Sequence, residues 1–229
     1  MQGVPLAIEE HLNLVRAGAA EIERWRKCHP DTQLELSGAD LAGIDLAETD
    51  LYGTNFHRAN LRQANLRGTD LRHVEFDQAD LSGADLRQAN FDYTSFRSTN
   101  LGKANLESAD LGRADLRTAN LTQANLKKAN LRGSSLWMAE LSGADLRDAT
   151  LPSKTDSGPL GGFLELAATN GFESAQFSDA NFLPLYVEEA LNYAGQDDIP
   201  ELEVWPKMVA TAVANLRSIK RLMRRVEIT

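Results

Sequence analysis

The chain has 229 residues, and 24 Lys and Arg against 33 Asp and Glu give it a formal net charge of −9. That balance argues against direct binding along nucleic acid, which needs a basic surface. Cys28 is the single cysteine, so the sequence excludes an intrachain disulfide and offers no cysteine pair for zinc. The sequence shows neither a long apolar run nor a secretory signal pattern. We therefore expect a cytoplasmic protein without a membrane span.

The first expected element is a helical cap within residues 1–33. Pro5 suits the first turn of a helix, and the pair His29 and Pro30 ends it. Between these points the apolar residues recur at helical spacing: Ile8, Leu12, Val15, Ala19 and Ile22. We expect one helix over 5–28 that covers the start of the array that follows.

A repeat of five residues then runs from Leu36 to Leu151. Leu or Phe occupies every fifth position without a break, 24 times in all. A small or aliphatic residue stands two positions before each Leu or Phe, and Asp or Asn fills most of the positions between them. Period five matches neither a helix nor a plain strand. It fits three extended residues followed by a two-residue corner, because strand alternation then sends the small residue and the Leu to the same side.

The corners and the number of sides can both be read from the same repeat. A type II turn favours glycine at its second central position, and glycines stand two residues after the Leu in several units: Gly38, Gly43, Gly53, Gly68, Gly83, Gly133 and Gly143. A square coil would take about 20 residues, and this spacing aligns Phe56, Phe76 and Phe96 in one core column. A triangular coil would break that column. We therefore expect a four-sided solenoid with a dry core.

The repeated units resemble a known family. Its motif is Ala-(Asp/Asn)-Leu-X-X, and the units that carry the likeness include Ala39-Asp40-Leu41, Ala84-Asp85-Leu86 and Ala104-Asn105-Leu106. These units are similar to the pentapeptide-repeat family over residues 34–153, about half of the chain. The resemblance implies an all-β solenoid core, a right-handed quadrilateral β-helix of about six coils, flanked by N-terminal and C-terminal α-helical caps.

The composition changes in residues 154–229. We expect a short helix near 163–168, which ends before Asn170 and Gly171. The five-residue pattern returns with Phe172, Phe177 and Phe182, and this favours a partial last coil near 170–183. Two further helices are expected over 184–194 and about 206–226. The last helix is basic and amphipathic, which favours packing on the array or dimerisation over a membrane surface.

No pattern in the sequence points to catalysis or to a cofactor. The four histidines have no metal-binding spacing among themselves or with Cys28. The array carboxylates occupy an outward position that the repeat fixes, on an open surface without the burial that tunes a catalytic group. We therefore expect no enzyme activity, no catalytic residues, no cofactor and no metal.

The surface carries the remaining signal. Spacing 20 aligns four basic residues just after the Leu, broken only by Glu107: Arg67, Arg87, Lys127 and Arg147. This basic column is our candidate partner-binding face, and the alternative is a merely solvated charged stripe. Trp137 and Met138 should point outward on the side that carries the Phe column.

Two functions are the main expectations at this point, and a third, an enzyme or enzyme-linked regulator that acts on small molecules in residues 152–200, would need a deep polar pocket of which the sequence shows no sign. The first is a non-enzymatic scaffold that presents flat β-helix faces to a protein partner in a bacterial cytoplasm, with a homodimer through the C-terminal helices as a further option. The alternative comes from the resemblance alone, since some pentapeptide-repeat proteins mimic DNA and bind DNA gyrase. Such a DNA mimic would modulate topoisomerase activity or quinolone sensitivity. Direct contact with nucleic acid or with a membrane is expected in neither case.

Overall fold

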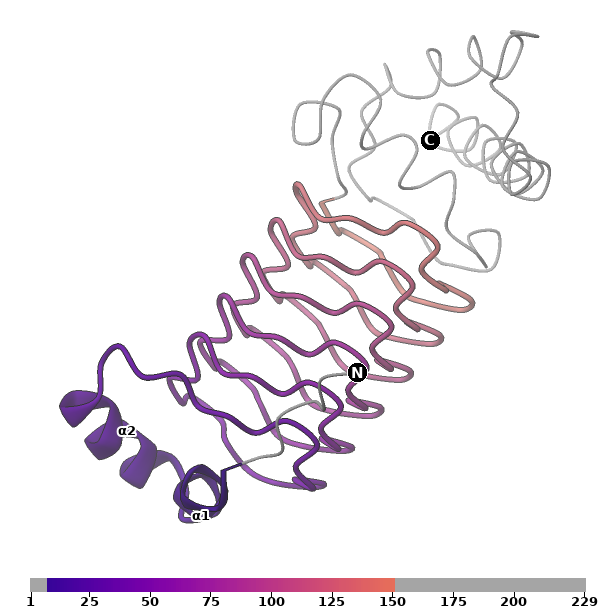
Figure 1. Cartoon of the computed structure of the whole chain (residues 1–229). Helices are drawn as coiled ribbons and strands as arrows, with labels where there is room; N and C mark the ends of the chain where they lie inside the picture. The colour runs from indigo at the N-terminus through magenta and orange to yellow at the C-terminus, as the bar shows by residue number, and fades with distance from the viewer. Residues whose placement is uncertain (1–7, 151–229) are drawn as a thin grey trace, which may run out of the picture.

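The computed structural model describes residues 8–150, which form two short helices followed by one long stack of coils (Figure 1). Helix α1 spans Glu9–Arg16 and helix α2 spans Ala19–Cys28. The expected elements after residue 150, including the partial coil near 170–183 and the later helices, lie outside the described residues. Neither described helix has the length and apolarity of a membrane span.

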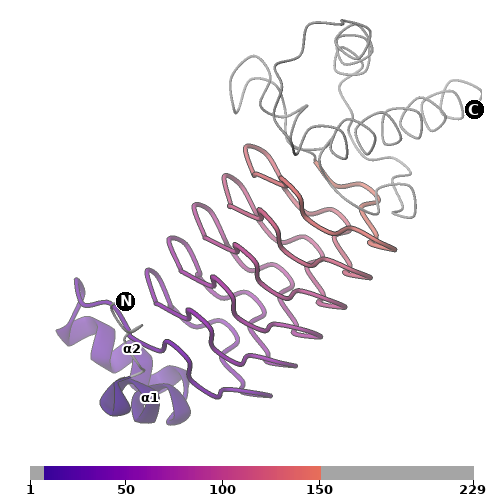
Figure 2. The same cartoon turned by 45° about the vertical axis from the view of Figure 1, so that its right-hand side comes forward.

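The coils stack through parallel β-bridges between residues that are 20 positions apart. The first bridge joins Glu35 to Asn55 and the last joins Asn130 to Thr150, with one bridge at every fifth residue between them. Each turn of the solenoid therefore has four sides, as the phenylalanine spacing predicted. Figure 2 shows the coils edge-on, one above another along a single axis.

Backbone hydrogen bonds connect each side to the coils above and below it. The Leu36 N–H donates to the Asn55 carbonyl at 2.8 Å, and the Asn55 N–H donates to the Leu34 carbonyl at 2.8 Å. Within the corner, the Ala39 N–H donates to the Leu36 carbonyl at 3.0 Å. The same pattern repeats along the array, so almost every main-chain polar group that faces another coil is satisfied.

The second corner residue takes a positive φ at every described corner, whether or not it is glycine. Gly83 has φ of 69°, and Gln63 and Lys128 have φ of 57° and 58°. Sixteen non-glycine residues adopt this conformation, at a cost on the order of 1 kcal/mol each. Glycine is thus helpful at these corners but not required, because the stacked coils impose the turn on whichever residue occurs there.

Each side contributes two columns of buried side chains to the interior, one of Leu or Phe and one of small residues. Phe56, Phe76 and Phe96 are fully buried, and their rings stack with centroids 5.2 Å apart and interplanar angles of 3° and 8°. Phe91, on the adjacent side, meets Phe96 edge to face at 5.1 Å. The Ala or Thr residues of each unit are buried as well, so the core is dry and continuous along the axis.

The helical segment before the array is a pair of helices, so the prediction of one helix over 5–28 was wrong. The chain changes direction between α1 and α2 at Gly18 (Figure 1), whose φ of 95° lies outside the range that other residues readily adopt. Val15 of α1 and Ile22 of α2 are both fully buried and belong to the core.

The two helices lie against the Leu36 end of the array (Figure 1). The Ile8 N–H donates to the Glu35 carbonyl at 3.1 Å, and the Glu35 N–H donates to Nδ1 of His11 at 3.0 Å. Arg26 reaches further round the coil and donates to the Tyr52 carbonyl at 2.7 Å. These bonds satisfy main-chain groups of the first coil that have no coil beneath them.

Candidate interaction surface

The basic column expected from the sequence lies along one side of the solenoid, where the 20-residue register aligns its four members, with Glu107 between Arg87 and Lys127. Its members are not free cations. Arg87 pairs with Asp85 through two hydrogen bonds of 2.8 and 2.5 Å, and Arg147 pairs with Asp145 through two of 2.8 and 2.6 Å. Lys127 also lies 3.3 Å from Asp145.

Arg67 is the remaining member of the column, and it donates to the Gln88 side chain at 3.3 Å. The ion pairs of the other members lower the pKa values of their carboxylates. Hydrogen bonds from Arg147, with Lys127 adding to them, lower the pKa of Asp145 to about 2. The hydrogen bonds from Arg87 lower the pKa of Asp85 as well. Three of the four members of the basic column are therefore held in ion pairs with Asp85 or Asp145, which offset part of the positive charge of the column.

A recurring arrangement underlies this ladder, and we call it the Asp-Leu-Arg clasp. An Asp before the central Leu holds the Arg after that Leu in a two-pronged ion pair. Four units form the clasp: Asp70 with Arg72, Asp85 with Arg87, Asp115 with Arg117, and Asp145 with Arg147. The planar guanidinium matches the carboxylate geometry, which makes these the stronger kind of surface ion pair.

A different side of the solenoid carries exposed aromatic residues that sequence reasoning missed. Tyr52 and His73 have ring centroids 5.3 Å apart, and His73 stacks on Tyr93 at 5.2 Å with an interplanar angle of 10°. Tyr52 is 44% exposed and Tyr93 is 51% exposed. We call these three residues the aromatic ladder. Their sequence spacings, 21 and 20, do not mark them as one column until the coils are stacked.

Two guanidinium groups border the aromatic ladder. Arg72 lies 5.6 Å from the centroid of Tyr52, and Arg113 lies 4.3 Å from that of Tyr93. Both distances are within the range of cation–π attraction. Arg113 is held further by two hydrogen bonds to Asp92, of 2.9 and 2.5 Å, and by one to the Tyr93 hydroxyl at 2.9 Å. The ladder is thus fixed in place rather than left as loose surface side chains.

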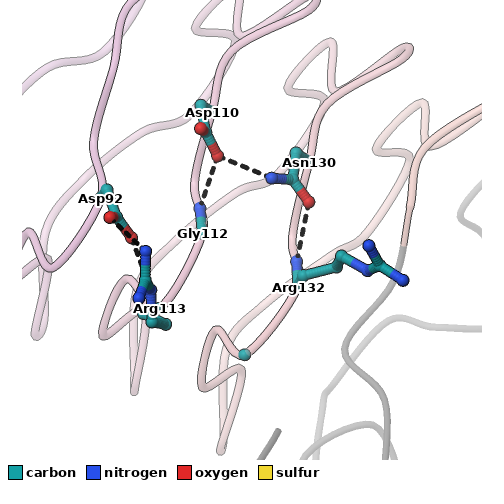
Figure 3. A pocket seen from close by; sticks show the side chains of 7 residues that line it. Asp92, Asp110, Gly112, Arg113, Asn130 and Arg132 are labelled. Atoms are coloured by element: carbon teal, nitrogen blue, oxygen red, sulfur yellow. Dashed lines mark hydrogen bonds and ion pairs between the residues drawn. The ribbon is translucent and has the colours of Figure 1, made fainter.

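An open groove of about 470 Å³ adjoins the Arg113 end of the aromatic ladder. Its lining includes Asp92, Asp110, Gly112, Arg113 and Arg132. Figure 3 shows Asp92 and Arg113 facing one another, with Asp110 beside them. The ladder and the groove share Arg113 and so form one continuous surface.

Other residues singled out from the sequence lie apart from this surface. Met138 is 42% exposed and Trp137 is half-buried, next to Leu136 on the side of the Phe column. Of the other histidines, His57 belongs to the array, whereas His11 and His29 belong to the helical segment and both pack against Trp25. Within residues 8–150 no group of three or more His, Cys, Asp or Glu side chains could hold a metal ion.

Comparison with known proteins gives one family and several similar structures. The family model of pentapeptide repeats matches in eight copies, over residues 35–73, 69–107, 99–137 and 109–148. No curated protein matches the chain.

Three solved structures illustrate the range of similarity. Trypsin-treated QnrB1, described as a plasmid-mediated fluoroquinolone resistance protein, is 18% identical, with 73% of this chain and 90% of that one covered and a TM-score of 0.45. Rfr23 from the cyanobacterium Cyanothece 51142 is 26% identical over 59% of this chain and 95% of its own, with a TM-score of 0.33. HetL from Nostoc sp. strain PCC 7120, described as involved in heterocyst differentiation regulation, is 29% identical over 66% and 72%, with a TM-score of 0.27.

Proposed function

Since this chain belongs to the pentapeptide-repeat family, whose members form right-handed quadrilateral β-helices, we propose that it is a non-enzymatic scaffold that binds a protein partner. The proposed scaffold has about six coils, with α1 and α2 as the cap of its first coil. The proposal places the protein in a bacterial cytoplasm and requires no cofactor. A homodimer through the C-terminal helices would be compatible with it.

The exposed aromatic ladder is the observation that carries this proposal. Tyrosine and arginine are enriched where protein interfaces concentrate their binding energy, and this ladder places Tyr52 and Tyr93 on the surface beside Arg72 and Arg113. Burying an aromatic side chain on a rigid support costs little conformational entropy. The backbone under the ladder is hydrogen-bonded between coils, so the surface is organised before a partner arrives.

The basic column remains a second candidate face, but the ladder is the stronger one. A partner that used Arg87 or Arg147 would have to compete with Asp85 or Asp145 for the guanidinium. Replacing such an exposed ion pair by a similar one with the partner gains little binding free energy, on the order of 0 to 1 kcal/mol. A partner packed on the rings of the aromatic ladder would leave the ion pairs of Arg72 with Asp70 and of Arg113 with Asp92 in place.

The test is a comparison of bound proteins between variants of the full chain. Tagged protein is incubated with extract of the source cell, alongside a Tyr52→Ala and Tyr93→Ala double variant and a variant with the basic column reversed to glutamate. We expect a defined partner to be lost with the tyrosine variant, by about tenfold or more, and retained with the reversed one. Loss only on charge reversal would assign the interface to the basic column, and retention by both variants would contradict a scaffold that uses either face.

The alternative is a DNA mimic that binds DNA gyrase and modulates topoisomerase activity or quinolone sensitivity. Mimicry of a phosphate backbone needs a regular array of uncompensated negative charges. On this solenoid, Asp70, Asp85 and Asp145 are each bound to arginine, which weighs against the alternative. A gyrase supercoiling assay separates the two: activity unchanged at about 10 μM protein, where even weak specific complexes form, removes the mimic.

A further inference from the structure

Among the described aspartates that directly precede a central Leu beyond the first coil, Asp110 is the one without a cation within 4 Å. Beyond the first coil, five aspartates directly before a central Leu each lie within 4 Å of an Arg or Lys: Asp70, Asp80, Asp85, Asp115 and Asp145. The cation comes from one of two places, either two residues after the Asp or 18 residues before it. At Asp110 these places hold Gly112 and Asp92, so neither can supply a positive charge.

The geometry around Asp110 is that of a clasp with its arginine missing. One carboxylate oxygen, Oδ1, accepts hydrogen bonds from the Gly112 N–H at 3.0 Å and from the Asn130 side chain at 2.7 Å. The same backbone bond, from the residue two positions on, is present in the four clasps. Within residues 8–150 no guanidinium or ammonium group bonds to Asp110.

The neighbouring arginines do not fill the gap. Arg113 is bound to Asp92, and Figure 3 shows the Arg132 side chain extended away from Asp110. The space where a clasp arginine would lie is the groove of about 470 Å³. Gly112, which forms part of its lining, is buried. The groove is therefore the vacated arginine position of the repeat, open to solvent.

We propose that this groove binds an arginine side chain of the partner protein, which completes the Asp-Leu-Arg clasp at Asp110 from outside. The inference rests on the proposed function, since it states the chemistry by which a partner is recognised. Arginine fits better than lysine because the four clasps of this chain all use the two-pronged pairing that only a guanidinium offers. The groove adjoins Tyr93 through Arg113, so a partner packed on the aromatic ladder is placed to bring its arginine there.

Two substitutions test the site without disturbing the repeat. Asp110→Asn removes the charge but keeps an acceptor for the Gly112 N–H, as the asparagines of other units do. Gly112→Arg supplies the arginine from within. Its backbone has no positive φ to forbid a side chain. A Cβ there would lie 3.0 Å from Asp110 Oδ1, so the carboxylate has to shift by a few tenths of an ångström, in a position that Arg87 occupies beside Asp85. Asp80→Asn is the matched control on another side of the solenoid.

The probe is the peptide acetyl-Gly-Arg-Gly-amide, added to the full chain at low salt while the amide signals of Gly112 and Gly133 are followed by NMR. The same peptide with lysine, or with citrulline as the neutral isostere of arginine, provides the comparison. We expect saturable shifts with the arginine peptide, about tenfold weaker binding with citrulline, and a severalfold weaker response with lysine. Asp110→Asn and Gly112→Arg should each weaken binding about tenfold, and Asp80→Asn should leave it unchanged.

Three results would overturn the inference. They are the absence of saturable shifts up to about 50 mM arginine peptide, equal binding of the citrulline peptide, and binding that survives Asp110→Asn. The failure of this site is separable from the failure of the scaffold. A partner lost with the tyrosine variant but no arginine-peptide binding rejects the groove alone, whereas peptide binding without any captured partner rejects the scaffold alone.

Discussion

Replacing Phe76 with alanine would remove the centre of the phenylalanine column. The ring is fully buried between Phe56 and Phe96, each at 5.2 Å, and meets Phe91 edge-on at 6.4 Å. A buried Phe to Ala change costs about 3–5 kcal/mol through lost transfer energy and the cavity left behind. Loss of the two stacked contacts adds roughly 1 kcal/mol. We therefore expect the free energy of unfolding to fall by about 5 kcal/mol.

The measurement is equilibrium unfolding in urea or guanidinium, followed by circular dichroism on the full chain. Phe76→Leu is the matched control, because leucine fills the same position in most units, and it should cost only about 1–2 kcal/mol. In a stack where each coil contacts only its neighbours, the alanine variant should also broaden the transition, since the coils on either side become less coupled. A cost below about 2 kcal/mol for the alanine variant would refute a stacked core column, because no buried phenylalanine in a dry core is that dispensable.

Three further predictions concern charge, the helical segment and the corners. Arginine contacts lower the pKa of Asp145 from 3.8 to about 2, so the clasp should contribute its stability above about pH 4 and lose it as the pH falls toward 2. Solvent screening limits this contribution to about 1 kcal/mol. The free energies of unfolding of Asp145→Asn and of the unchanged chain should therefore differ at neutral pH and become equal near pH 2. A difference that stays constant with pH would contradict the pairing. Arg26→Ala removes the hydrogen bond to the Tyr52 carbonyl and should lower the local stability of the helical segment by about 1–2 kcal/mol. Amide hydrogen exchange should become faster at Ile22 but not at Leu126. The same exchange rate at Ile22 in the variant and the unchanged chain would contradict this role of Arg26. Gln123→Gly relieves a φ of 59° at an exposed corner and should be neutral or stabilise by about 0.5 kcal/mol, whereas a loss above about 1 kcal/mol would show that the corner needs its side chain.

The sequence alone determined the period, the number of sides and the identity of the core. Strand alternation and a fixed corner convert a five-residue repeat into four sides, and register every 20 residues then brings Phe56 above Phe76. These are local consequences of the chain, repeated until they define the fold. The glycine rule was weaker than expected, because inter-coil hydrogen bonds hold residues such as Gln63 and Lys128 in the same conformation that glycine adopts freely.

Only the tertiary structure decided what the surface is. The basic column is visible in the sequence, but its neutralisation depends on how Arg87 and Arg147 bend back onto Asp85 and Asp145. The break between α1 and α2 at Gly18 likewise appears only in the structure, where Val15 and Ile22 belong to the same core. Tyr52 and His73 stand at different positions of their units and meet only because one coil lies over the next at β-sheet spacing. Which side chains touch across two coils depends on the direction that each side chain takes. The five-residue period of the sequence does not specify that direction.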